Sequence, residues 1–85
     1  MQLKILRELF RAGVLKSAHV TPAPMVEDSW VIFFERIDGG QENLTTQRGE
    51  EKRYRGLPAA MEDIRRIGFK KVITVLPSDH IPIKR

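Results

Sequence analysis

Cysteine is absent from this 85-residue sequence, which excludes disulfide bonds and thiolate metal sites. No apolar run approaches the length of a membrane span. The first fifteen residues also lack the apolar segment of a secretory signal, because charged residues from Lys4 to Arg11 divide it. These absences favour the cytoplasm, where thiols stay reduced.

Histidine is scarce, and the spacing of His19 and His80 matches no metal motif. Ser78, Asp79 and His80 are the residue types of a nucleophilic triad, but a triad needs groups that reach one another from separate elements. No glycine pattern of a phosphate or dinucleotide loop occurs. We therefore expect no enzyme, no metal and no cofactor.

What is present suits one small globular domain, since 41% of the residues are hydrophobic and 31% are charged. We expect the domain to span residues 1–76 and residues 77–85 to form a loose tail with two prolines. From apolar periodicity and turn residues we predict helices over 3–12 and 58–67 and strands over 18–27, 29–37, 42–47, 52–55 and 70–76.

This order predicts an α+β fold with an N-terminal helix, a mostly antiparallel sheet of three to five strands, and a second helix before the last strand. Pro22 and Pro24 predict that strand 18–27 is interrupted or lies at an edge. In the second helix we expect a buried face and a polar face. The buried face is predicted to hold Leu57, Ala60, Met61, Ile64 and Ile67, and the polar face Glu62, Asp63, Arg65 and Arg66.

Strand 29–37 is apolar on both faces, with Trp30, Ile32 and Phe34 on one side and Val31 and Phe33 on the other. A sheet covered on one side alone should alternate apolar and polar residues. Either the two helices cover opposite faces, or a second protomer buries the second face. We expect a homodimer, and we assign Trp30, Ile32 and Phe34 as candidate partner-binding residues.

The net charge of +4 and the isoelectric point of about 9.9 are compatible with an acidic partner. Two basic sets lie in the second half of the chain, one in the stretch "LTTQRGEEKRY" and its neighbours, the other from the second helix onward. The candidate nucleic-acid-binding residues are Arg48, Lys52, Arg53, Arg55, Arg65, Arg66, Lys70 and Lys71. The 44–56 segment is either a basic hairpin that contacts nucleic acid or a solvated turn, and Glu50 and Glu51 at its tip favour the second reading.

The motifs "LRELFRAGVL" at 6–15, "PAPM" at 22–25 and "LTTQRGE…KRYRGLPAAMEDIRRIGFKKVIT" at 44–74 resemble small partition-associated proteins of the ParC family, encoded on plasmids and other mobile elements. The resemblance implies an accessory role in plasmid maintenance, through a partition ATPase, a centromere-binding protein or DNA.

Residues 30–67 also resemble, in architecture, the sheet-plus-helix arm-binding domains of tyrosine recombinases, which bind DNA through the sheet. From both resemblances we expect a non-enzymatic binding protein that acts on a protein partner, with direct reading of duplex DNA by hairpin 44–56 as the alternative.

Overall fold

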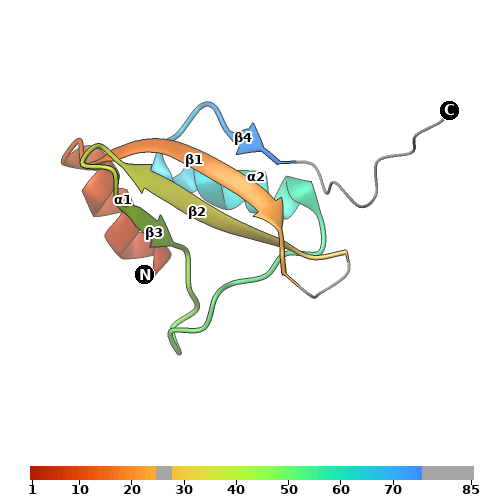
Figure 1. Cartoon of the computed structure of the whole chain (residues 1–85). Helices are drawn as coiled ribbons and strands as arrows, with labels where there is room; N and C mark the ends of the chain where they lie inside the picture. Colours follow the sequence, from red (N-terminus) through yellow and green to blue (C-terminus); the bar gives the residue numbers. More distant parts are fainter. Residues whose placement is uncertain (25–27, 76–85) are drawn as a thin grey trace, which may run out of the picture.

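The structure is a computed structural model that describes residues 1–24 and 28–75. Its elements are α1 (Leu3–Arg11), β1 (Leu15–Pro22), β2 (Trp30–Arg36), β3 (Gln41–Asn43), α2 (Leu57–Ile67) and β4 (Ile73–Thr74). The strands form one sheet in the order β3-β2-β1-β4, in which only the β1–β4 pair is parallel (Figure 1). This arrangement confirms the predicted α+β class, with the second helix before the last strand.

Both helices cover the same face of the sheet (Figure 1). Because paired residues on neighbouring strands point to one side, Ala18 and Phe34 share a face, as do Val20 and Ile32. These side chains form one core with Leu6 of α1 and with the apolar stripe of α2. The alternative in which the helices lie on opposite faces is therefore wrong. The other face of the sheet carries no helix among the described residues.

Strand β1 begins at Leu15, three residues earlier than expected, and it lies inside the sheet between β2 and β4. The predicted edge position was therefore wrong, and the strand ends at Pro22 instead of at residue 27. Pro22 is the last residue of β1, and β4 pairs only with His19 and Val20. The missing N–H therefore lies beyond the reach of β4.

Three predicted strands are much shorter in the structure, and the one expected over 42–47 is reduced to Gln41–Asn43. Residues 52–55 contribute only an isolated bridge between Tyr54 and Trp30, and the last strand is reduced to Ile73–Thr74. The segment between α2 and β4 is irregular. The predicted tail, including Ser78, Asp79 and His80, lies outside the described residues.

The end of α2 is fixed by a close approach to α1. Gly68 has a φ of +135°, and a Cβ atom at this position would lie 2.5 Å from the ring of Phe10. Only glycine fits this combination of backbone angle and contact. The chain then continues into Phe69, whose ring packs against those of Phe10 and Phe34 with centroids 4.7 Å and 5.6 Å apart.

Candidate nucleic-acid and partner interface

The hairpin predicted over 44–56 has its backbone pairing within residues 44–54, and Arg55 follows directly at its base. The N–H of Lys52 donates to the carbonyl of Leu44 at 3.0 Å, and the N–H of Thr46 donates to that of Glu50 at 2.7 Å. Gly49 closes the turn with a φ of +87°, a conformation that glycine adopts at little cost. The hairpin is thus a defined local structure in which the backbone groups near its turn are paired.

The base of the hairpin is joined to strand β2. Trp30 and Tyr54 exchange two backbone hydrogen bonds of 2.7 Å and 2.8 Å, and the N–H of Leu44 donates to Ile32 at 3.1 Å. The side chains of Leu44 and Tyr54 are buried in the core. These contacts hold the hairpin against the sheet at both of its ends.

A charge cluster around the buried carboxylate of Asp63 joins the hairpin to α2. The phenol of Tyr54 donates a hydrogen bond to Oδ2 of Asp63, and Nζ of Lys52 contacts the same oxygen at 3.0 Å. Nη1 of Arg66 lies 3.8 Å from Oδ1. Asp63 is only 7% exposed, so its predicted place on the polar face of the helix was wrong. Met61 is also misassigned, since this predicted core residue is 40% exposed.

The electrostatics of the cluster follow from this geometry. Burial alone would raise the pKa of Asp63, but hydrogen bonds from Tyr54 and Lys52 and the attraction of Lys52 and Arg66 outweigh it. The pKa of Asp63 therefore lies below its usual value. Burial and the hydrogen bond to Asp63 raise the pKa of Tyr54 far above its usual value. The pair is thus a neutral phenol bound to an ionised carboxylate.

The remaining hairpin cations project into solvent. Arg48, Arg53 and Arg55 are exposed, and none of them makes an ion pair with any residue in 1–24 or 28–75. Lys52 differs from them, because Asp63 holds its ammonium group. At the tip, Glu51 accepts a hydrogen bond of 3.0 Å from Nδ2 of Asn43. The hairpin therefore offers three free guanidinium groups instead of the four predicted cations.

The second predicted basic set is divided. On α2, Arg65 pairs with Glu62 at 2.9 Å and Arg66 lies 3.8 Å from the same carboxylate. Beyond the helix, Lys70 and Lys71 are exposed and make no ion pair within the described part of the chain. Lys70 and Lys71 lie on a different flank of α2 from the hairpin cations. Asp63 of α2 faces the hairpin, whereas Met61 faces the segment that carries Lys70. These two helix residues are about 200° apart around the helix axis.

The three residues assigned to partner binding lie on the covered face of the sheet. Ile32 and Phe34 are fully buried, and Trp30 packs against the same core. A partner that binds the sheet would instead contact the face opposite the helices, which we call the open face. There the rings of His19 and Phe33 stack with centroids 4.5 Å apart, and Ile73, which pairs with His19, is 53% exposed.

The open face also brings together Ser17, His19 and Glu35. Oγ of Ser17 donates to Oε1 of Glu35 at 3.2 Å and lies 2.8 Å from Nε2 of His19. The hydroxyl of Ser17 thus stands between the carboxylate of Glu35 and the imidazole of His19. In a nucleophilic triad the carboxylate holds the histidine and the histidine accepts from the serine, so the order here is different.

These groupings were missed in the sequence although a signal for each exists. Asp63 stands three residues after Ala60 and four before Ile67, which places it beside the buried stripe of α2. Ser17 and His19 are two residues apart and therefore lie on the same face of β1. Glu35 of β2 is paired directly with Ser17.

No protein family, no curated protein and no solved structure matches this chain. Within residues 1–24 and 28–75, neither helix is long and apolar enough to cross a lipid bilayer.

Proposed function

We propose that this chain is a non-enzymatic binding protein, an accessory factor in the maintenance of a plasmid or another mobile element that acts by contact with an acidic partner. The observation that supports binding is the hairpin itself. Arg48, Arg53 and Arg55 extend from a base that Tyr54 and Asp63 attach to the core. A braced support lowers the ordering cost of binding, and a guanidinium group suits carboxylate and phosphate partners.

The side-chain clusters favour binding over catalysis. The carboxylate of Asp63 is engaged by Tyr54 and Lys52, which leaves it a structural anion instead of a general base. The carboxylate of Glu35 accepts from the hydroxyl of Ser17, whereas in a nucleophilic triad the carboxylate holds the histidine. Both clusters are explained by the contacts they make within the fold.

Direct binding of duplex DNA is the second candidate function. Unpaired arginines on a hairpin support it, because phosphate contacts come largely from Arg and Lys side chains. The acidic tip opposes it, since Glu50 and Glu51 stand between Arg48 and Arg53. Both functions use the hairpin arginines, and they differ in whether the chain binds duplex DNA with the salt dependence that phosphate contacts cause.

The experiment is fluorescence anisotropy of a random-sequence duplex at increasing salt. Direct binding should weaken with a logarithmic slope of about 0.9 for each phosphate contact. The variant Arg53→Glu with Arg55→Glu should abolish binding. The matched control is Arg7→Glu with Lys16→Glu, which makes the same change in charge at two exposed positions on other elements. It should retain most of the affinity.

No binding at low salt, or equal losses in both variants, would remove the DNA function. The proposal then depends on a protein partner, tested by biosensor measurement with the partition ATPase and the centromere-binding protein of the same replicon. The hairpin variant should lose affinity and the control variant should keep it. If neither protein and no duplex binds the wild-type chain, the accessory role in partition is wrong.

Homodimerisation stays a prediction, and the fold indicates which face of the sheet the dimer interface would use. Since both helices cover one face of the sheet, a second copy would pack on the open face, where Ile73 and Val75 are 53% and 45% exposed. Sedimentation velocity should show a dimer that Ile73→Lys converts into a monomer. A monomer at high concentration of the wild-type chain would contradict the prediction.

A further inference from the structure

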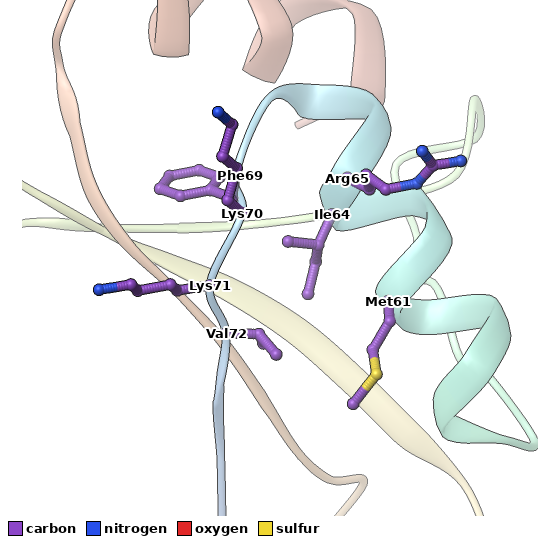
Figure 2. A pocket seen from close by; sticks show the side chains of 7 residues that line it. All are labelled: Met61, Ile64, Arg65, Phe69, Lys70, Lys71 and Val72. Carbon is purple, nitrogen blue, oxygen red and sulfur yellow. The ribbon is translucent and has the colours of Figure 1, made fainter.

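A pocket lies between α2 and the segment that follows it (Figure 2). It encloses about 340 Å³, within the range of small ligand sites. Its lining consists of Met61, Ile64, Arg65, Phe69, Lys70, Lys71 and Val72. In Figure 2 the side chains of Met61 and Ile64 point from the helix toward Val72 on the other wall. The inner surface of the pocket is therefore apolar.

The local fold explains why this space stays open. Gly68 turns the chain at the end of α2, and the N–H of Phe69 still donates to Ile64 at 3.3 Å. The ring of Phe69 is then held between those of Phe10 and Phe34. The following residues run back along the helix toward β4 at a distance that the side chains of Met61 and Val72 do not fill. Met61 remains 40% exposed as a result.

The rim of the pocket is cationic, and within residues 1–24 and 28–75 no acidic residue lines it. Arg65, Lys70 and Lys71 contribute their apolar stems to the lining, while Figure 2 shows their charged ends turned outward in different directions. Glu62 pairs with Arg65, whereas Lys70 and Lys71 have no ion-pair partner among the residues that the structure describes. Positive charge is thus distributed around an apolar opening.

We propose that this pocket binds one large apolar side chain of a partner protein, carried on a peptide segment with acidic residues on both sides of it. The charge pattern favours this occupant over a fatty acid or a phosphate. Lys70 and Lys71 are the rim cations without an ion-pair partner in the described part of the chain, and their charged ends diverge in Figure 2. A ligand with a single anionic head could therefore satisfy only one of them, whereas carboxylates on both sides of an apolar side chain reach them separately. An apolar anchor in a pocket with a polar rim is also the usual form of an energetically dominant contact.

The chain's own end is a poorer match. Residues 76–85 contain Ile81 and Ile83, but Lys84 and Arg85 outnumber Asp79, so this segment repeats the charge of the rim. The proposed contact goes beyond the hairpin function, because the pocket and the hairpin lie on different flanks of α2. The pocket and the hairpin are tested by different variants, so a negative result for one of the two surfaces does not contradict the proposal for the other.

The test uses the full chain and a fluorescein-labelled synthetic peptide with one central phenylalanine between two pairs of glutamates. Matched peptides replace the phenylalanine by alanine, or the glutamates by lysines. The anchor peptide should bind at least about tenfold more tightly than either matched peptide. Equal affinity of the phenylalanine and alanine peptides would overturn the proposal, since attraction to the surface charge alone would then explain binding.

The variant Met61→Glu introduces a charge at the mouth of the pocket at a helix position that tolerates glutamate, and it should lower affinity at least about tenfold. Lys70→Glu with Lys71→Glu should do the same. Ile5→Glu is the matched control, because Ile5 is a 45% exposed apolar residue on α1. Circular dichroism confirms that each variant is folded. Unchanged affinity in Met61→Glu would place the peptide elsewhere and overturn the proposal.

Two other occupants have their own outcomes. Binding of dodecanoate without binding of the anchor peptide would overturn the proposal in favour of a small amphiphile. Nuclear Overhauser contacts between the methyl group of Met61 and those of Ile81 or Ile83 in the free protein would overturn it in favour of the chain's own end. Peptide-induced chemical shifts confined to residues around Met61 and Val72 would support it.

Discussion

The phenol of Tyr54 donates a hydrogen bond to the carboxylate of Asp63, and this contact joins the arginine-bearing hairpin to helix α2. Both residues are only 7% exposed, so water competes little for either group. Lys52, on the same hairpin, neutralises the charge that the carboxylate carries into the interior. The stability of the domain and the presentation of its exposed arginines therefore depend on one buried anion.

Replacing Asp63 by alanine should lower the free energy of unfolding by about 2 to 3 kcal/mol, because it leaves a buried phenol without an acceptor and a lysine without its partner. Urea denaturation measures the loss. The neighbouring Glu62→Ala is the control, since its ion pairs with arginines are exposed and should contribute far less. Equal losses in the two variants would contradict a structural role for the buried contact.

Acid should remove the contribution of Asp63 in a defined direction. Its pKa is lower in the folded protein than its usual value near 3.8, so the stability it provides is complete above that value and is lost as the pH falls through the lower folded pKa. The difference in unfolding free energy between wild type and Asp63→Asn should stay constant near neutral pH and shrink below about pH 4. A difference that does not shrink in acid would show that the carboxylate is not the source.

Tyr54 should not ionise while the protein is folded. It is the only tyrosine, and its folded pKa lies well above the usual value of 10. Its contribution to stability is complete below pH 10 and is lost as the pH rises beyond it. Tyrosinate absorbance should therefore rise together with the change in Trp30 fluorescence that reports unfolding. Ionisation at pH 10 in a protein that is still folded would contradict the buried contact.

Gly68→Ala should destabilise the domain by about 2 to 3 kcal/mol, since the new Cβ meets the ring of Phe10 and the positive φ is strained. Gly49→Ala also places alanine at a positive φ, of +87°, but has no atom within 4 Å of the new Cβ. It should cost about 1 kcal/mol. Thermal or urea unfolding measures the loss of unfolding free energy in both variants. A loss in Gly68→Ala no larger than that in Gly49→Ala would contradict the close contact with Phe10.

The two faces of β2 should respond differently to truncation. Ile32→Ala removes a fully buried side chain and should cost about 2 to 5 kcal/mol. Phe33→Ala removes a larger side chain from the open face and should cost less than half as much, because Phe33 is only partly buried there. The reverse order in urea denaturation would show that the open face is covered in solution.

Local patterns were sufficient to predict the order of elements. The apolar spacing of α1 and α2 and the glycines after them placed both helices to within a residue or two, and alternation along β2 assigned Trp30, Ile32 and Phe34 to one side. The pairing of β4 with β1 could not be predicted in this way. A two-residue parallel strand has no periodicity of its own, and its position depends on how the chain returns from α2.

The hairpin was found from its turn residues, but the role of its cations was not. Lys52 and Arg53 look alike in the sequence, and only the position of Asp63 on the inner flank of α2 distinguishes the paired lysine from the free arginine. The covered face of the sheet was also undetermined, because a strand that is apolar on both sides gives the same pattern whichever face the helices take.

The bridge between Trp30 and Tyr54 has a consequence for solubility. Strand β3 pairs only with Phe33, Phe34 and Glu35, so without the base of the hairpin the first half of β2 would expose unpaired backbone groups. Such an edge is a template for pairing with another chain. Mutations that detach the hairpin should therefore produce aggregation before they produce full unfolding. The same segment that carries the exposed arginines would thus also prevent edge-to-edge pairing between the sheets of different molecules.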